Sequence, residues 1–327
     1  MRSEIKAGMP PQGSGDFSAL DGSLKFDKPA GGPPPEFRVR MADIAWVKRK
    51  YLDLPYETVS PAQRLDLYLP DEGDGPFPLV VHLHGGGFGM GDKRDDHMDT
   101  YLQGLKHGYA LASVEYRLSG EAIFPAAVLD CRAAFRWLRL HAAEYHLDPD
   151  RFCALGGSAG GNLSALMGMN IPNGQFPGEE GRDFPVSCAV QAAVDQFGPI
   201  DFRHMDEQAH ANGISFADHD QPFSAESSYM GGALPQLSDA WLAKADPTSY
   251  ISEAMAPMLV EHGCMDKLVP FTQSVQFVHA IYQKLGAGRV EFVPLPDADH
   301  EDKEYASAWN QRVLWSWLDE HLKGGNQ

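Results

Sequence analysis

The sequence lacks any apolar run long enough to cross a membrane as a helix, which needs about 20 consecutive apolar residues. It also lacks the apolar segment of a secretory signal peptide, because the opening residues Met1–Lys6 carry charge and no such segment follows them. These two absences argue against a membrane protein and lead us to expect a cytoplasmic location.

Basic residues are scarce relative to acidic ones. The chain has 27 lysines and arginines against 45 aspartates and glutamates, which gives a formal net charge of −18. An excess of negative charge disfavours contact with nucleic-acid backbones and with anionic membrane surfaces. We therefore expect neither nucleic acid nor membrane among the partners, whereas a homo-oligomeric assembly is left open.

Cysteine is also scarce, with 4 residues in 327 and no C-x-x-C spacing. A disulfide framework or a zinc ribbon needs cysteines in pairs. Each cysteine lies within an apolar pattern typical of a strand or helix, so buried free thiols are predicted. The residues are Cys131, Cys153, Cys188 and Cys264.

The glycine-rich segment 85–91 lacks the residues of a nucleotide-binding loop. The spacing from Gly86 to Gly91 suits a P-loop, but Asp92 stands where a P-loop needs lysine. No G-x-G-x-x-G pattern can be drawn through the segment either. These mismatches exclude the phosphate-loop and dinucleotide interpretations of the glycine run.

The most informative stretch present is Ala154–Asn162, which contains the pattern G-x-S-x-G around Ser158. In this pattern a strand ends in a sharp turn, the serine stands at the apex, and a helix begins behind it. A side chain at Gly156 or Gly160 would collide with neighbouring backbone in so tight a turn. The free N–H groups at the start of the helix can stabilise a developing oxyanion. A glycine-rich turn that merely holds a serine is the alternative, so the flanking elements decide.

The flanking residues fit the pattern, since 151–157 is predicted to be a buried strand and 163–169 a helix. Two further helices are predicted at 125–146 and 271–285. The other predicted strands are 44–51, 64–69, 78–84, 109–116, 188–194, 258–261 and 290–293. Strands that alternate with helices imply a mostly parallel sheet with helices on both faces. Eight strands with the turn after the fifth match the α/β-hydrolase fold.

Composition divides the chain into two unequal parts. Residues 1–40 are rich in Gly, Pro and Ser and lack a core pattern, so an extended tail or arm is predicted there. Residues 41–327 form the predicted catalytic domain. Within that domain, residues 200–250 fit the strand–helix alternation poorly and follow the sixth strand, where α/β sheets place ligand-covering segments. We therefore predict a lid at about 200–250.

The predicted lid mixes aromatic and polar side chains. It includes Phe216, Asp218, His219, Asp220, Gln221 and Phe223. Lids that bind lipid are usually more uniformly apolar, whereas sugar sites combine aromatic faces with hydrogen-bonding groups. The mixture favours small acyl groups on a sugar, although an ordinary solvated loop remains open. The lid histidines and aspartates match no tight zinc spacing, so no metal site is predicted.

A second functional loop, His84–Phe88, follows the predicted third strand directly. It is an HGGG-type loop, which in esterases faces the nucleophilic serine. Glycines let the backbone approach the oxyanion and direct N–H groups at it. We assign the oxyanion hole to the N–H groups of Gly86, Gly87 and Ala159, and we expect His84 to hold the loop in place.

The general base and its orienting acid are expected after the serine, in the order Asp and then His. Asp266 follows the seventh strand and His300 follows the eighth, so both fall on loops at the same sheet edge as the serine. The rival histidine His262 precedes Asp266 and would break this order. Asp297 and Asp299 lie too near His300 in sequence for a comfortable approach.

Together the two motifs resemble the hormone-sensitive-lipase-like branch of the α/β-hydrolases. Three further stretches, Tyr116–Ala127, Leu147–Arg151 and Asp195–Phe202, resemble the BD-FAE-like family of bifunctional feruloyl and acetyl xylan esterases. The last stretch departs from the family pattern at Gln196, where an aromatic residue is expected, and it should lie near the pocket. The resemblance covers 78–302 and implies removal of acetyl or feruloyl groups from plant cell-wall carbohydrate without a cofactor.

The sequence thus predicts a serine carboxylester hydrolase in which Ser158 attacks the carbonyl, His300 moves the proton and Asp266 orients His300. Phe88 and Phe197 are candidate substrate-binding residues, and the expected partner is a small-molecule or oligosaccharide ester. A general short-chain carboxylesterase or an amidase would use the same three residues. A non-catalytic receptor on the same fold is the remaining alternative, although such proteins typically lose one of the three.

Overall fold

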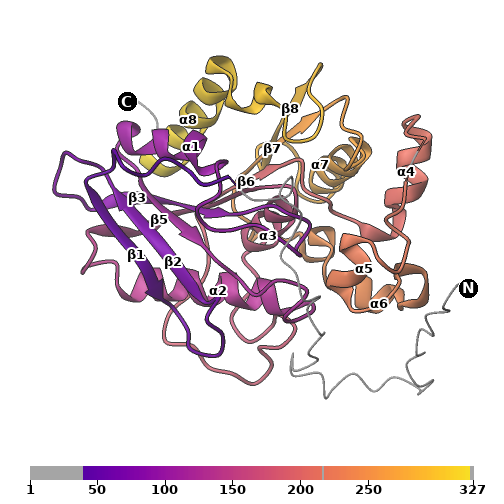
Figure 1. Cartoon of the computed structure of the whole chain (residues 1–327), viewed down its shortest axis with the longest axis horizontal. Helices are drawn as coiled ribbons and strands as arrows, with labels where there is room; N and C mark the ends of the chain where they lie inside the picture. The colour runs from indigo at the N-terminus through magenta and orange to yellow at the C-terminus, as the bar shows by residue number, and fades with distance from the viewer. Residues whose placement is uncertain (1–39, 216, 325–327) are drawn as a thin grey trace, which may run out of the picture.

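The computed structural model describes residues 40–215 and 217–324. Its centre is an eight-stranded sheet with the strand order β1-β2-β4-β3-β5-β6-β7-β8 (Figure 1). The strands are β1 (Arg49–Pro55), β2 (Arg64–Leu69), β3 (Phe77–Leu83), β4 (Ala110–Val114), β5 (Leu147–Gly157), β6 (Ala192–Gln196), β7 (Met258–Gly263) and β8 (Val290–Leu295). The pairs β1–β2 and β2–β4 are antiparallel, and the remaining neighbours in this order are parallel.

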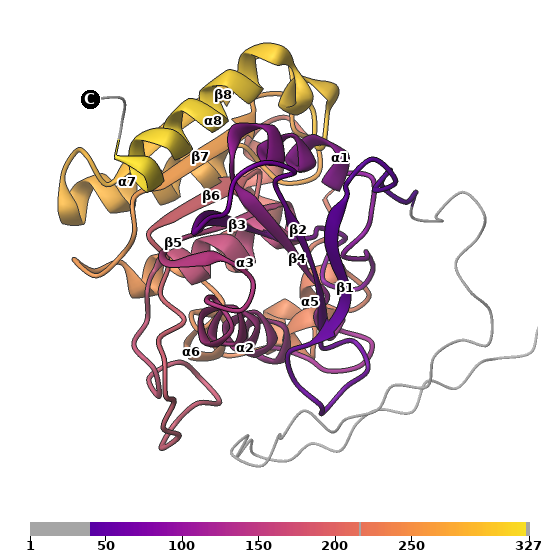
Figure 2. The same cartoon turned by 90° about the vertical axis from the view of Figure 1, so that its left-hand side faces the viewer.

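Helices cover both faces of the sheet because the buried central strands present apolar side chains to both sides in alternation. On β3, Val81 belongs to one core cluster and Val80 to the other. The first face is covered by α2 (Ala126–Leu140), α3 (Ala159–Gly168) and α7 (Thr272–Leu285), and the second by α1 (Met98–Tyr101), the 3₁₀ helix η3 (Leu102–His107) and α8 (Ala308–Lys323) (Figure 2). The predicted α/β-hydrolase fold is confirmed.

Two predicted boundaries are wrong around the strand that leads into the sharp turn at Ser158, which is called the elbow here. The helix predicted over 125–146 ends at Leu140, where His141 leaves the helical conformation and its Nδ1 atom lies 2.8 Å from the Trp137 carbonyl. β5 begins at Leu147 rather than at 151, because Leu147 already pairs with Phe77 of β3. The register then shifts, which lets the strand include a proline at an irregular position.

Four more points of the sequence analysis need correction. The sixth strand lies at Ala192–Gln196 instead of 188–194, and the first at Arg49–Pro55 instead of 44–51. Helix α8 had no predicted counterpart, although its buried residues Leu314, Leu318 and Leu322 recur at helical spacing. All four cysteines are free, but Cys264 is exposed because it lies in the turn after β7.

The segment predicted to form a lid lies between β6 and β7 and is called the cap here (residues 200–250). It consists of short helices: η4 (Phe202–His204), α4 (Met205–Ala211), α5 (Ala225–Met230), η5 (Leu234–Gln236), α6 (Asp239–Leu242) and η6 (Pro247–Tyr250). Phe216 of the cap and residues 1–39 of the predicted tail lie outside the described residues. Among the helices described, none combines the length and the apolar character that a membrane crossing requires.

Candidate active site

Ser158 stands at the sharp turn between β5 and α3. Its backbone angles are φ 56° and ψ −124°, in a region that residues with a side chain rarely adopt. The turn is fixed by hydrogen bonds: the Ser158 N–H donates to the Gln196 carbonyl at 2.9 Å, and the Gly161 N–H donates to the Ser158 carbonyl at 2.8 Å. The fold therefore holds this serine in one strained conformation at the carboxyl edge of the sheet.

The two glycines beside the serine are required by close backbone contacts. An ideal Cβ atom on Gly160 would lie 2.0 Å from the Leu83 carbonyl oxygen. The same atom on Gly156 would lie 2.5 Å from that oxygen and 2.5 Å from the Gly160 carbonyl oxygen. The steric role predicted for both glycines is confirmed.

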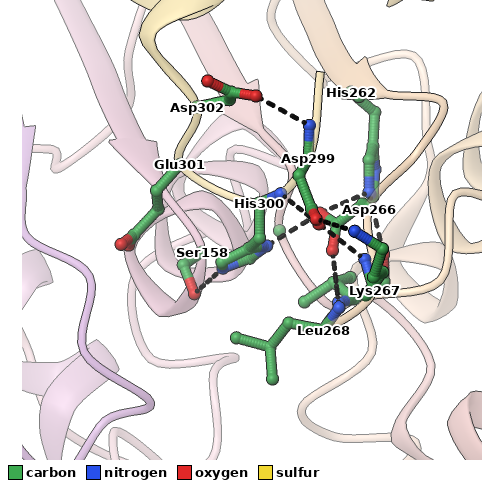
Figure 3. A network of polar contacts seen from close by, with 12 residues as sticks. Ser158, His262, Asp266, Lys267, Leu268, Asp299, His300, Glu301 and Asp302 are labelled. Carbon is green, nitrogen blue, oxygen red and sulfur yellow. Dashed lines mark hydrogen bonds and ion pairs between the residues drawn. The ribbon is translucent and has the colours of Figure 1, made fainter. Parts of the chain in front are cut away.

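Three side chains from three separate loops form a continuous chain of hydrogen bonds (Figure 3). His300 Nε2 lies 3.0 Å from Ser158 Oγ, and His300 Nδ1 lies 2.7 Å from Asp266 Oδ2. An ionised carboxylate can only accept, so Nδ1 donates to Asp266 and Nε2 is left to accept the serine proton. The structure thus brings together Ser158, His300 and Asp266 in the geometry of an activated nucleophile.

Asp266 is buried and surrounded by donors. Its Oδ1 atom accepts from the backbone N–H groups of Leu268 and Val269, each at 2.8 Å. Burial alone would raise the pKa of Asp266, but the hydrogen bonds with His262 and His300 hold that pKa well below its usual range. The carboxylate consequently stays ionised at any pH near neutrality.

The rivals that the sequence offered for base and acid have other contacts. His262 is buried, with Nε2 at 3.2 Å from Asp266 Oδ2 and Nδ1 at 2.7 Å from Ser274 Oγ. Asp299 pairs with the side chain of Lys267 at 2.5 Å, and its Oδ1 atom accepts from the backbone N–H of His300 at 2.9 Å. His262 therefore supports Asp266, and Asp299 supports the loop that carries His300.

The loop His84–Phe88 lies directly against the elbow, since a Cβ atom on Gly85 would be 3.4 Å from the Cβ atom of Ser158. Gly86 and Gly87 have φ angles of 99° and 57°, which glycine adopts without steric cost. Within the described chain, the N–H groups of Gly86, Gly87 and Ala159 donate no hydrogen bond to another residue. All three remain available to a ligand oxygen.

His84 holds this loop from behind. Its ring stacks on Tyr116 with centroids 4.2 Å apart, and the Tyr116 hydroxyl donates to the His84 carbonyl at 2.8 Å. His84 Nε2 lies 3.5 Å from Glu115 Oε1. Burial lowers the pKa of His84, but the Glu115 carboxylate outweighs burial and the net direction is upward. His84 therefore supports the loop, as its place at the end of β3 predicted.

A cavity of about 220 Å³ opens beside Ser158. The loop His84–Phe88, called the oxyanion loop here after its predicted role, contributes Phe88 to the wall, and the cap contributes Asp218, His219, Phe223 and Glu226. Sequence reasoning placed His219 and Phe223 in a lid, but it did not single out Glu226. The six-residue helix that carries Glu226 is too short to give a periodic signal.

The two aromatic residues predicted to bind substrate have different positions. Phe88 lines the cavity, and its ring stacks on Tyr229 of α5 with centroids 3.8 Å apart. Phe197 is not among the residues that line this cavity. Its ring instead packs edge-on against the ring of His300 at 4.9 Å and against Tyr305 at 4.4 Å. Phe197 thus contacts the predicted base from behind rather than the space in front of the serine.

The cap is fastened to the loops of the site through His219. His219 Nδ1 lies 2.7 Å from Asp206 Oδ1, and Nε2 lies 2.9 Å from the Leu268 carbonyl oxygen. The Leu268 N–H in turn donates to Asp266. His219 therefore links the cap to the turn that carries the acid.

Gln196 does not lie beside the cavity as the sequence comparison led us to expect. Its side chain is buried, where its Oε1 atom accepts from the Tyr101 hydroxyl at 2.5 Å and its Nε2 atom donates to Glu261 at 2.5 Å. These partners belong to the face of the sheet covered by α1 and α8. The departure from the family pattern at Gln196 therefore changes the core rather than the cavity wall.

A larger groove, of about 900 Å³, lies around Trp137, Arg136 and Trp241 and includes none of the three residues of the hydrogen-bonded chain. Volume alone does not identify a site, and Ser158 lies at the smaller cavity. The residues described here contain no cluster of three or more His, Cys, Asp or Glu side chains able to hold a metal ion.

Comparisons with known proteins place this geometry in a family. The BD-FAE family model matches residues 65–281. Esterase LipQ of Mycobacterium tuberculosis is 32% identical over 251 residues, which cover 76% of this chain and 56% of LipQ. The chain spans about half the length of the curated relatives LipQ and LipM.

Two solved structures share the architecture. One, described as a truncated form of a carbohydrate esterase from gut microbiota, has a TM-score of 0.73 and 24% identity over 87% of this chain and 100% of that chain, a likeness that bears on the fold. The bifunctional GH43-CE of Bacteroides eggerthii has a TM-score of 0.71 and 29% identity over 84% of this chain and 35% of that chain. Since the matched family model runs from β2 into α7 and includes the elbow, the chain belongs to the BD-FAE family of α/β-hydrolases.

Proposed function

We propose that this protein is a serine carboxylester hydrolase that removes small acyl groups, acetyl or feruloyl, from carbohydrate. One observation carries the proposal: Ser158 Oγ, the two nitrogens of His300 and Asp266 Oδ2 form one chain with steps of 3.0 and 2.7 Å. A serine hydroxyl becomes a good nucleophile only when a positioned base takes its proton.

In the proposed acylation step, Ser158 Oγ attacks the ester carbonyl carbon and His300 Nε2 accepts the serine proton. Asp266 stabilises the imidazolium that forms. The N–H groups of Gly86, Gly87 and Ala159 stabilise the negative charge on the carbonyl oxygen. His300 then gives the proton to the alcohol oxygen as the bond to the acyl carbon breaks, which leaves an acyl-serine.

In the proposed deacylation step, His300 Nε2 takes a proton from a water molecule, which attacks the acyl carbon. The same N–H groups stabilise the second oxyanion. His300 then returns the proton to Ser158 Oγ as the carboxylic acid leaves. No cofactor enters either step.

The size of the cavity and the relatives support the choice of substrate. Pockets for drug-sized ligands span roughly 300–1,000 Å³, so the cavity of about 220 Å³ favours an acetyl group over a feruloyl or long alkyl chain. Two solved structures with this fold are described as carbohydrate esterases or as carrying a CE part.

A second candidate function, a short-chain carboxylesterase without sugar preference, is favoured by the curated relatives. LipQ and LipC of Mycobacterium tuberculosis are named esterases, and neither name specifies a carbohydrate. The same chemistry at Ser158 would serve both functions, so the alcohol part of the substrate separates them.

The test is a matched panel of esters. We expect the purified protein to hydrolyse 4-nitrophenyl acetate and to lose activity along a series from acetyl to octanoyl. Acetylated and feruloylated xylo-oligosaccharides are assayed beside simple esters with the same acyl groups. A higher kcat/KM on acetylated sugars supports the carbohydrate assignment. An equal or lower value supports the second candidate, and a maximum at octanoyl contradicts both.

We also propose that the cap determines the order of these esters by kcat/KM. Residues 210–224 include Asp218, His219 and Phe223, which line the cavity. Replacing this segment with a scrambled version of the same composition should change the order of substrates. Labelling of Ser158 by an organophosphate is the control, because it reports the nucleophile independently of the alcohol. An unchanged order with full labelling contradicts a role of the cap in specificity.

A further inference from the structure

Glu226 is a buried carboxyl group in the wall of the cavity that contains Ser158. Only 8% of its surface is exposed. Among the residues described, its carboxyl group accepts from its own backbone N–H and forms no ion pair and no hydrogen bond to another side chain. A carboxylate has room for several hydrogen bonds, so a buried carboxyl group with one backbone donor keeps acceptor positions that a ligand can fill.

Two contacts fix the position of Glu226 relative to the oxyanion loop. Helix α5 begins beside this loop, since a Cβ atom on Gly87 would lie 2.9 Å from the Cβ atom of Ala225. The start of the helix is capped by Ser224, whose Oγ accepts from the Ser227 N–H at 3.0 Å and donates to the His219 carbonyl at 2.5 Å. Glu226 therefore enters the cavity from a rigid support next to the oxyanion donors.

The charges around Glu226 are mixed. Burial is the main factor that raises the pKa of Glu226, and the carboxylates of Asp218 and Asp206 act in the same direction. His219 acts against them. Asp218 and His219 also line the cavity. The part of the wall that the cap supplies is thus rich in acceptors, which suits a ligand that brings hydrogen-bond donors and carries no negative charge.

We propose that Glu226 recognises the carbohydrate part of the substrate by accepting hydrogen bonds from sugar hydroxyl groups. The inference rests on the proposed function and specifies how that site distinguishes a sugar ester from a simple ester. A site built to hydrogen-bond a hydroxyl discriminates strongly against an analogue that lacks it, because the buried acceptor is then left unpaired. The acyl group would be common to both esters, so the discrimination would come from the alcohol.

The experiment compares a monoacetylated methyl xyloside with 4-nitrophenyl acetate, which share the acyl group. The variants are Glu226→Ala, which removes the acceptor, and Glu226→Gln, which keeps one carbonyl oxygen in a similar shape. The matched control is Glu207→Gln, which removes one exposed carboxylate from helix α4 of the same cap, outside the cavity. Steady-state kcat and KM are measured on both esters for each protein.

For Glu226→Ala we expect the ratio of kcat/KM on the xyloside to kcat/KM on nitrophenyl acetate to fall about 10-fold or more, mainly through KM. Glu226→Gln should fall less, because it keeps an acceptor. The ratio for Glu207→Gln should equal that of the wild type. Organophosphate labelling of Ser158 and the midpoint of thermal unfolding are recorded for each variant, so that a misfolded protein is recognised. If Glu226→Ala is misfolded, the ratio measured for Glu226→Gln tests the role of Glu226.

A folded Glu226→Ala protein with the wild-type ratio overturns the role of Glu226. An equal loss on both esters also overturns it, since a merely structural side chain would affect both alike. Either result leaves the proposed function standing while the wild type still cleaves nitrophenyl acetate. A wild-type protein inert to both esters contradicts the proposed function itself.

Discussion

The Nε2 atom of His262 lies 3.2 Å from the Oδ2 atom of Asp266, the oxygen that also faces His300. Nε2 of His262 is also 3.0 Å from the Val269 carbonyl oxygen. Both partners accept, so His262 donates from Nε2 and its Nδ1 atom is free to accept from the Ser274 hydroxyl. The side chain that sequence order excluded as the base is therefore a buried donor to the acid.

His262→Ala should lower kcat about 10-fold or more with a smaller change in KM, because Asp266 loses one of the donors that fix its carboxylate. The matched control is His279→Ala, which makes the same substitution at an exposed position of helix α7. Kinetics on nitrophenyl acetate, together with unfolding midpoints, check the prediction. A kcat equal to that of the control would show that Asp266 and His300 position themselves without His262.

Ser158→Ala should fold and lose about 10⁴-fold or more of the ester hydrolysis, since the attacking oxygen is removed. Ser164→Ala in α3, the helix that follows Ser158, is the control, because Ser164 is also buried and its Oγ atom has no partner among the described residues. Turnover and organophosphate labelling measured side by side test the role of Ser158. A Ser158→Ala protein that keeps a tenth of the wild-type turnover would exclude this serine as the nucleophile.

The proposed mechanism also fixes the sign of the pH dependence. The pKa of Asp266 is held well below its usual range, so Asp266 stays ionised on moderate acidification. Asp266 therefore does not cause a loss of kcat on acidification, and such a loss is expected when the group that accepts the serine proton is itself protonated. Asp266→Asn should keep the fold and lower kcat by about 10⁴-fold through the wrong tautomer of His300. A flat kcat between pH 5 and 8, with chemistry rate-limiting, contradicts His300 as the base.

The three residues of the hydrogen-bonded chain could be brought together from the sequence because each follows a strand of a parallel sheet, where neighbouring strand ends meet at one edge. Ser158 follows β5, Asp266 follows β7 and His300 follows β8. Their order in the sequence and their local motifs are sufficient to predict that they meet, without any knowledge of long-range packing.

The cavity wall could not be predicted in the same way. Glu226 reaches the site only because α5 packs on Gly87, a tertiary contact without a local signal. Gln196 was expected near the pocket because its strand ends there. Successive strand residues point to opposite faces, so Asp195 lies against Gly161 of α3 while Gln196 faces Tyr101. A one-residue uncertainty in register reverses such an assignment.

Two buried carboxyl groups behind the site make stability depend on pH. Burial raises the pKa of Asp195 and that of Glu261 to about 7, from ordinary values of 3.8 and 4.5. At pH values between the ordinary pKa values and the raised ones, the folded protein binds more protons than the unfolded chain. The free energy of unfolding therefore decreases as pH rises toward 7. Above that range the contribution of these groups is constant. We expect a lower unfolding midpoint in urea at pH 8 than at pH 5.5.

Glu261→Gln removes one of these titrations while keeping a carbonyl oxygen for the Gln196 amide, which donates to Glu261 at 2.5 Å. The difference between the midpoints at pH 5.5 and pH 8 should therefore shrink. Glu291→Gln, at an exposed position of β8, should keep the wild-type difference. If Glu261→Gln instead keeps the wild-type difference between the two midpoints, as Glu291→Gln should, Glu261 does not make stability depend on pH in this range.

The contact between the oxyanion loop and the cap gives the most specific prediction. Gly87→Ala places a Cβ atom 2.9 Å from the Cβ atom of Ala225 and forces alanine to adopt φ 57°. The clash should push the loop and α5 apart, and we expect kcat/KM to fall about 10-fold or more because an oxyanion N–H is displaced. Gly108→Ala is the control for backbone strain alone, since Gly108 has φ 77° and a Cβ atom there would have no neighbour within 4 Å.

The double variant Gly87→Ala/Ala225→Gly separates the two causes of the loss. Replacing Ala225 by glycine removes the atom that the new methyl group meets, so the clash disappears while the strain at residue 87 remains. We expect the double variant to recover most of the lost kcat/KM, whereas its unfolding midpoint should stay as low as that of Gly87→Ala, because glycine in α5 weakens the helix. If kcat/KM does not recover, the methyl group at residue 87 obstructs the oxyanion site itself, and the contact with α5 does not position the loop.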